Sequence, residues 1–177
     1  MTLRAAFGQD AEALAALMRR NREFFRTGGP ARDADDPFFT AAGQREVIER
    51  AEANAEADTG RMFLVEVEGE LVGRVNLNSI IRGAFQSASV GYMVDEAWTG
   101  RGVATAALRA LIAVAFGELD LHRLQGETLT TNIASQRVLE RCGFSRYGRA
   151  PDYLFIGGRW QTHDLFQLVN PDHRGPR

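Results

Sequence analysis

Hydrophobic positions in the middle of the chain follow the period of a strand and then that of a helix. The segment 88–94, Ala-Ser-Val-Gly-Tyr-Met-Val, is short and mostly apolar, which is typical of a strand. Farther on, apolar residues recur at the spacing of an amphipathic helix: Ala104, Leu108, Leu111, Ile112 and Ala115. The pattern therefore predicts a strand, a short glycine-containing loop and a helix in direct succession.

The same patterns predict the elements on either side. We expect strands at 2–7, 62–67, 71–75 and 124–129, and a tight hairpin at 155–160 that turns on two glycines. We expect helices from a cap at Asp10 as far as Phe25, through Val47 and Ile48, and from Asn132 to Arg141, with a loop at 27–38. The order β-α-α-β-β-β-α-β-α-β-β predicts an α/β (α+β) fold in a single domain, residues 1–177.

The loop Trp98–Thr105 is the strongest candidate for a binding site. Gly100 and Gly102 lack side chains, so backbone N–H groups can approach one point, and the first N–H groups of the helix have no internal partner. This arrangement attracts an anion such as a phosphate. A P-loop would need a Lys-Ser/Thr pair, which is missing, and a dinucleotide motif would need a glycine at Thr105. A turn whose glycines serve packing alone is the remaining alternative.

A second cluster lies downstream, where Asn132 can cap a helix and Gly143 can end it. With this cluster the chain resembles the GCN5-related N-acetyltransferase (GNAT) superfamily. The pyrophosphate loop of that family, Q/R-x-x-G-x-G/A, is matched by Thr99, Gly100, Arg101, Gly102, Val103 and Ala104, with Thr99 as the one departure. Its N-x-x-S element and the following Gly-Phe are matched by Asn132, Ser135, Gly143 and Phe144.

The resemblance extends to the RimJ/RimL-type branch, which acetylates the N-terminal alanine of ribosomal proteins. Five segments carry it: Asn21–Phe25, Ile81–Phe85, His122–Leu124, Asp152–Ile156 and Gly158–Asp164. The resemblance implies a GNAT fold with a mixed, mostly antiparallel twisted sheet of about seven strands and flanking helices. It also implies that the fourth and fifth strands splay apart to admit the pantetheine arm of acetyl-CoA.

Composition narrows the range of partners. The chain has 177 residues, of which 45% are hydrophobic and 25% are charged, and its net charge of −2 gives no basic footprint for nucleic acid. Cys142 is the single cysteine, which excludes an internal disulfide and suits a reducing cytoplasm. The histidines lack the spacing of metal ligands, and there is no long apolar run for a membrane. We therefore expect a cytoplasmic protein without a metal, either a monomer or a homodimer.

Acetyl transfer to an amine needs a neutral amine, a polarised carbonyl and a proton for the leaving thiolate. At pH 7 an α-amine with a pKa of about 7.8 costs about 1 kcal/mol to deprotonate, against about 4.6 kcal/mol for a lysine. Glu127 is the candidate general base, with an exposed strand residue as the alternative reading, and Ser135 is the candidate donor to the coenzyme sulfur. A backbone N–H around Met93 and Val94 is expected to polarise the carbonyl.

Three aromatic residues are candidates for the acceptor groove: Phe24, Phe85 and Tyr153. Asn132 is expected to bind the pantetheine amides and Arg101 to face the pyrophosphate.

The predicted function is acetyl transfer from acetyl-CoA to a peptide N-terminus, and the resemblance favours a ribosomal protein as the acceptor. Two alternatives stay open: an acetyltransferase for a small amine such as an antibiotic or polyamine, and a non-catalytic acyl-CoA-binding or ribosome-assembly factor.

Overall fold

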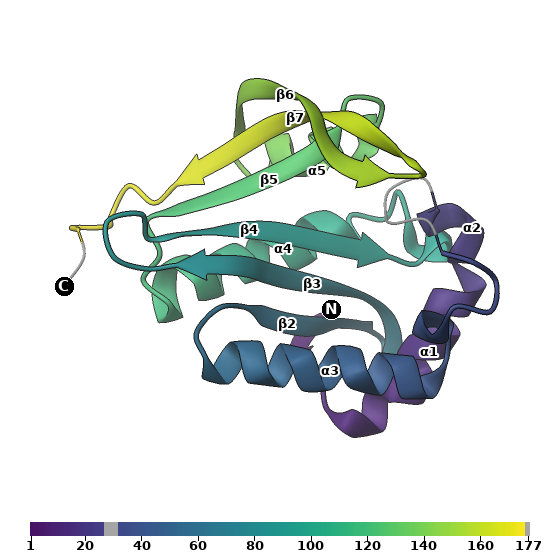
Figure 1. The fold of residues 1–177 in the computed structure, drawn as a ribbon. Helices are drawn as coiled ribbons and strands as arrows, with labels where there is room; N and C mark the ends of the chain where they lie inside the picture. The colour runs from purple at the N-terminus through teal and green to yellow at the C-terminus, as the bar shows by residue number, and fades with distance from the viewer. Residues whose placement is uncertain (27–31, 176–177) are drawn as a thin grey trace.

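A single twisted sheet forms the centre of the computed structural model, which describes residues 1–26 and 32–175 (Figure 1). Its seven strands lie in the order β1-β2-β3-β4-β5-β7-β6, and every neighbouring pair is antiparallel except β4 and β5, which are parallel. The predicted mixed sheet is thereby confirmed. The strands are β1 (Thr2–Ala5), β2 (Arg61–Val67), β3 (Glu70–Ile81), β4 (Ser87–Val94), β5 (Arg123–Leu129), β6 (Ser145–Ile156) and β7 (Arg159–Val169).

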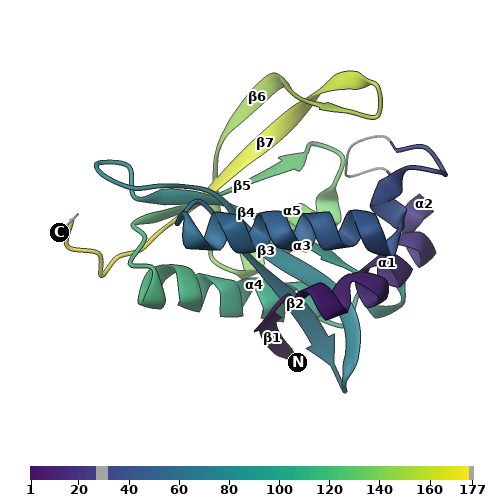
Figure 2. The same cartoon turned by 60° about the horizontal axis from the view of Figure 1, so that its bottom comes forward.

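Helices cover both faces of the sheet, with α1 and α3 on one face and α4 and α5 on the other (Figures 1 and 2). The larger hydrophobic core lies under α4 and α5, where Leu108, Leu111 and Leu139 pack against the strands. The smaller core joins Leu14 of α1 and Ile48 of α3 to the sheet. The helices are α1 (Ala11–Arg20), α2 (Arg22–Phe25), α3 (Ala41–Glu56), α4 (Val103–Ala113) and α5 (Ile133–Arg141).

The first predicted helix is wrong in two respects. Helix α1 ends at Arg20, and Phe25 belongs to the separate short helix α2. The break falls at Asn21, whose side-chain Oδ1 accepts a hydrogen bond from the backbone N–H of Glu96 at 2.8 Å. Asp10 stands at the N-cap position, but its carboxylate binds the Arg4 guanidinium instead of a helix N–H. Of the predicted loop at 27–38, residues 27–31 lie outside the described part of the chain.

Strands β4 and β5 separate soon after they begin. They pair only at Ser87–Ser89 of β4 and Arg123–Gln125 of β5, and beyond these residues the two strands diverge. The splayed pair that the resemblance implies is therefore present. Its closed end lies beside the β3–β4 turn, and its open end lies where β4 leads into the loop before α4.

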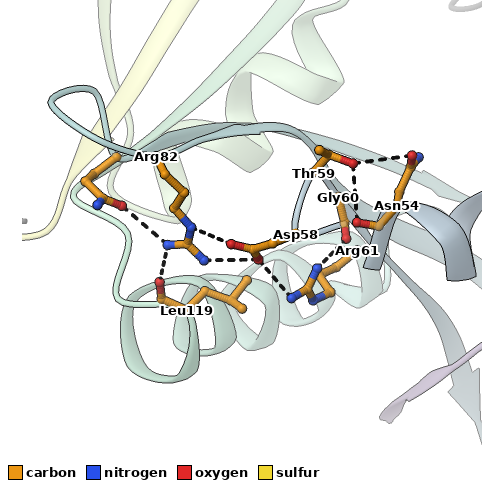
Figure 3. Close-up of polar contacts among 8 residues, drawn as sticks. Asn54, Asp58, Thr59, Gly60, Arg61, Arg82 and Leu119 are labelled. Carbon is orange, nitrogen blue, oxygen red and sulfur yellow. Dashed lines mark hydrogen bonds and ion pairs between the residues drawn. The ribbon is translucent and has the colours of Figure 1, made fainter. Parts of the chain in front are cut away.

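A network of charged side chains fixes the closed end (Figure 3). Arg82, just after β3, donates to both carboxylate oxygens of Asp58 at 2.6 and 3.1 Å and to the carbonyl of Leu119 at 2.6 Å. Asp58 also accepts from Arg61 at 3.0 Å. Three segments that are distant in the sequence are thereby joined: the β3–β4 turn, the turn after α3 and the end of the helical segment that follows α4.

Candidate active site

A cleft of about 1060 Å³ opens where β4 and β5 diverge. On one side it is lined by the loop before α4 and by the start of α5, and on the other by α2, the turn Pro37–Phe39 and β3. The gap in the sheet thus connects the two faces of the molecule. The residues predicted from the sequence that line it are Phe24, Met93, Val94, Thr99, Gly100, Gly102, Val103, Ala104, Asn132 and Ser135.

The glycine loop has the backbone geometry expected of an anion site. Gly100 has φ +73° and Gly102 has φ +81°, and a Cβ on either residue would have nothing within 4 Å. The first hydrogen bond of this helix runs from the N–H of Ala106 to the carbonyl of Gly102. The N–H groups of residues 103–105 come before this bond, so they have no acceptor within the helix. Glycine therefore permits the turn and leaves room in front of the helix N-terminus.

Arg101 departs from the predicted placement. It is not among the residues that line the cleft, and its guanidinium lies over the ring of Trp98, 5.0 Å from the centroid. Two other arginines line the cleft from α5, Arg137 and Arg141. Either can bring positive charge toward an anion held by the glycine loop.

Ser135 is held in place from two directions. Asn132 caps α5 as predicted, because its Oδ1 accepts from the backbone N–H of Ser135 at 3.0 Å. Tyr92 of β4 lies on the other side, with its hydroxyl 2.8 Å from Ser135 Oγ and 3.1 Å from the Ser135 carbonyl. Burial raises the pKa of Tyr92 to about 12, so its phenol is neutral at pH 7 and can donate a hydrogen bond.

The end of β4 directs one backbone N–H toward the gap. Asp95 donates its N–H to the carbonyl of Val72 at 2.7 Å, and Val94 faces Gly73 in the antiparallel ladder. Residues opposite each other alternate between hydrogen-bonded and non-hydrogen-bonded pairs in such a ladder, so Val94 and Gly73 form a non-hydrogen-bonded pair. The N–H of Val94 therefore points away from β3, on the side where β5 has diverged, whereas that of Met93 points to β3.

Glu127 lies on β5, half-buried, and accepts a hydrogen bond from the hydroxyl of Ser89 at 2.6 Å. It is close enough to Tyr153 of β6 for its charge to raise the pKa of that phenol, although burial of Tyr153 is the larger cause. The Tyr153 ring packs on His163, with 5.5 Å between centroids. Neither Glu127 nor Tyr153 is among the residues that line the cleft.

Phe85 is not brought to the cleft. It lies in the turn between β3 and β4, at the end of β4 opposite Val94 and beside the Arg82 network. The Ile81–Phe85 segment thus lies at the closed end of the splayed strands. Phe24, in contrast, lines the cleft from α2 and is 40% exposed there.

Two residues of the site escaped the sequence analysis. Tyr92 was not singled out, although alternation along β4 places it with Val90 and Val94 on the face that α5 covers, and this alternation is visible in the sequence. Arg74 interrupts the apolar run of β3 and lines the cleft, and a charge inside such a run was the available signal.

Among residues 1–26 and 32–175, no group of three or more His, Cys, Asp or Glu is suited to a metal ion. None of the helices described is long and apolar enough to span a membrane.

Comparisons with known proteins agree with this geometry. A family model described as an acetyltransferase (GNAT) domain matches residues 1–145. The chain is 39% identical over 165 residues to a Bacillus subtilis protein named "Probable N-acetyltransferase YjcK", covering 92% of this chain and 90% of that protein. It is 30% identical over 173 residues to the [ribosomal protein uS5]-alanine N-acetyltransferase of Escherichia coli, covering 97% and 89%.

Solved structures show the same architecture. The ribosomal-protein-S5-alanine acetyltransferase of Vibrio fischeri superposes with a TM-score of 0.90 at 29% identity, covering 97% of this chain and 94% of that one. RimJ of Mycobacterium smegmatis, in complex with CoA-disulfide, gives a TM-score of 0.92 at 27% identity, covering 98% and 84%. The chain belongs to the GNAT family of N-acetyltransferases and is a RimJ/RimL-like member of it.

Proposed function

We propose that this acetyltransferase acetylates the α-amine at the N-terminus of a protein, with acetyl-CoA as donor and the alanine of a ribosomal protein as the most direct candidate acceptor. The observation that carries the proposal is the cleft at the β4–β5 gap, because it gives two partners access to one point from opposite faces of the sheet. Relatives named for this acetylation match nearly the whole chain. A cytoplasmic location would suit such an acceptor.

The residues on the α4 side fit a coenzyme with phosphates. The open space at Gly100 and Gly102 and the N–H groups of residues 103–105 suit a pyrophosphate, with Thr99, Val103 and Ala104 around it. Arg137 and Arg141 add positive charge, and Asn132 can bind the pantetheine amides. When bound, acetyl-CoA supplies the activated acetyl group as a thioester. The solved structure of Mycobacterium smegmatis RimJ in complex with CoA-disulfide supports this assignment.

Two groups of the chain can stabilise charge at the reacting atoms. The N–H of Val94, free of the β3 ladder, can donate to the acetyl oxygen as negative charge develops on it. Ser135 can donate a hydrogen bond to the leaving sulfur, and in that arrangement the hydroxyl of Tyr92 can donate to Ser135 Oγ and keep it oriented. The thiolate is a weak base, because its thiol has a pKa of about 8.5, so a hydrogen bond from a serine hydroxyl is sufficient to stabilise it and solvent can supply the proton.

Glu127 is the proposed general base, acting through water. Its carboxylate accepts a hydrogen bond from the hydroxyl of Ser89 and lies near Tyr153. It is located beside the gap between β4 and β5 and is not among the residues that line the cleft. An α-amine needs only about 1 kcal/mol of help at pH 7, so a distant base is adequate. Phe24 is proposed to contact the acceptor from α2, where it lines the cleft, and Tyr153 of β6, which lies outside the cleft lining, is proposed to contact a more distant part of the acceptor.

The test is turnover of the full chain with acetyl-CoA and a matched panel of acceptors. We expect acetylation of an Ala-starting peptide, none of the same peptide with a blocked N-terminus, and little of an internal lysine. Acetylation confined to polyamines or other small amines would contradict the proposal. Acetyl-CoA binding without turnover of any amine would also contradict it, in favour of a non-catalytic role.

A further inference from the structure

Arg74 is a cationic side chain of the cleft, and no carboxylate in residues 1–26 or 32–175 forms an ion pair with it. It lies on β3 between Leu64 of β2 and Met93 of β4, on the face that α1 and α3 cover. Its one hydrogen-bond contact in the described parts of the chain is the sulfur of Met62, 3.9 Å from Nη1. Burial lowers the pKa of Arg74 to about 10, so it still carries its charge at pH 7.

The other charges of the acceptor side do not neutralise Arg74. Two carboxylates line the cleft, Glu23 and Asp33. Glu23 forms ion pairs with Arg22 and Arg26, and Asp33 is not among the charges that shift the pKa of Arg74. The charge that acts on Arg74 is the like charge of Arg32, which further lowers its pKa. Residues 27–31 are Thr, Gly, Gly, Pro and Ala, so they contain no carboxylate.

Arg74 is half-buried, and a partly desolvated cation without an anionic partner, as Arg74 is among the described residues, is costly because no opposite charge offsets the desolvation. Such a side chain that also lines a cleft is suited to an anionic group of a ligand. Arg74 and Met93 lie on the face of the sheet that α1 and α3 cover, whereas Val90 and Val94 lie on the face that α4 covers. The coenzyme phosphates are assigned to the α4 face, and therefore not to Arg74. The anion that fits Arg74 therefore belongs to the acceptor.

We propose that the acceptor carries a carboxylate close to its reactive amine, and that Arg74 binds this carboxylate. The inference rests on the proposed function and names its substrate class more closely. Arg74 faces Met93, the neighbour of Val94, so the carboxylate lies near the point of transfer. An extended chain spans about 3.5 Å per residue, so a carboxylate within the first few residues of the acceptor can reach Arg74 while the amine lies at the point of transfer. An Asp or Glu side chain or the terminal carboxylate of a very short peptide offers the same chemistry.

The first arm of the test compares Ala-starting peptides that carry Glu or Gln at the second or third position. We expect the KM of the better Glu peptide to be about tenfold to a hundredfold below that of its Gln counterpart, as is usual for a hydrogen bond to a charged group. A second arm compares Ala-Ala with its C-terminal amide, which distinguishes a side-chain carboxylate from a terminal one. Equal KM values within every pair would overturn the proposal.

Variants assign the preference to Arg74. Arg74→Met should remove the preference, Arg74→Lys should keep part of it, and Arg45→Met, on the exposed face of α3, should leave it unchanged. Thermal unfolding shows whether each variant is folded. A preference that survives in folded Arg74→Met would overturn the proposal, as would an equal loss of kcat/KM with Glu and Gln peptides.

A binding measurement separates this inference from the proposed function. Calorimetry with N-acetylated Glu and Gln peptides, in the presence of CoA, reports carboxylate recognition without turnover. If no peptide is acetylated but the Glu peptide binds more tightly through Arg74, the proposed N-terminal activity fails and carboxylate recognition is upheld. If peptides are acetylated and bound without preference, the reverse holds.

Discussion

At the scale of single residues, the pair formed by Tyr92 and Ser135 is the most informative contact of the site. Ser135 lies in the first turn of α5, where a hydroxyl can rotate freely or satisfy a backbone group. The Tyr92 hydroxyl lies 2.8 Å from Ser135 Oγ and restricts that rotation. Because burial holds the pKa of Tyr92 at about 12, the pair keeps the same protonation across the neutral range. Tyr92 is a positioning residue that acts through Ser135.

Replacing Tyr92 with Phe should lower kcat by about tenfold, the equivalent of one lost hydrogen bond. Ser135→Ala should lower kcat further, and the double variant should be no slower than Ser135→Ala, because Tyr92 acts through the serine. Steady-state kinetics at saturating acetyl-CoA measures these effects. Tyr147→Phe is the control, because it removes an exposed tyrosine hydroxyl that accepts a hydrogen bond from Gln125. A Tyr92→Phe variant with unchanged kcat and a raised coenzyme KM would contradict this role.

At the scale of elements, local signals in the sequence predicted most of the fold. Asn132 caps α5 through Ser135 N–H, and Gly143 ends it with φ +89°. The turn at Gly157 and Gly158 has positive φ at both residues, as a two-residue hairpin needs. Each of these features depends on residues within a few positions of one another, so the sequence displays them directly.

Contacts between distant segments could not be predicted in this way. The helical pattern continues from Leu14 to Phe25, but α1 stops at Asn21, because that side chain binds the N–H of Glu96, 75 positions away. Tyr92 and Ser135 are 43 positions apart, so their contact is equally invisible in a local pattern. The candidate site was therefore predicted where it is built from one loop or one helix start, and missed where two elements meet.

The junction between the glycine loop and α4 is the element on which coenzyme binding is proposed to depend. Gly102→Ala should weaken acetyl-CoA binding by at least about tenfold, because its φ of +81° disfavours any Cβ by about 1–2 kcal/mol and the added methyl enters the proposed pyrophosphate space. Calorimetry gives the dissociation constant. Gly83→Ala is the matched control, since Gly83 has φ +67° and equally open surroundings but lies in the β3–β4 turn. Similar affinity in both variants would remove the loop from the coenzyme site.

At the scale of the whole molecule, ion pairs between carboxylates and arginines join separate elements. Asp10 binds Arg4 of β1, Asp95 binds Arg20 of α1, and Asp164 of β7 binds Arg149 of β6. The Arg82–Asp58 pair adds a further link at the closed end of the splayed strands (Figure 3). All four aspartates have pKa values below the ordinary value of 3.8. Protonation of any of these four carboxylates therefore changes the free energy of unfolding in the same direction.

A carboxyl whose pKa is lower in the folded state than in the unfolded state stabilises the fold above its unfolded pKa, here about 3.8. That contribution is lost as the pH falls through the folded value. Between pH 5 and 7 we expect these four groups to change the free energy of unfolding by only about a tenth of the free energy that corresponds to one pKa unit. Below about pH 4 we expect the free energy of unfolding to fall steeply. Urea denaturation at a series of pH values measures the change.

Asp164 provides the sharpest single test of this acid sensitivity. Its side chain is buried and the Arg149 guanidinium is the main cause of its lowered pKa, with Arg146 also contributing. Asp164→Asn should be less stable than the natural chain at pH 6, and the difference should shrink as the pH falls, because protonation removes the same charge from Asp164 itself. Asp35→Asn, at an exposed position, is the matched control and should keep a constant offset. A gap for Asp164→Asn that stays constant down to the acid transition would show that its carboxylate charge contributes nothing to the fold.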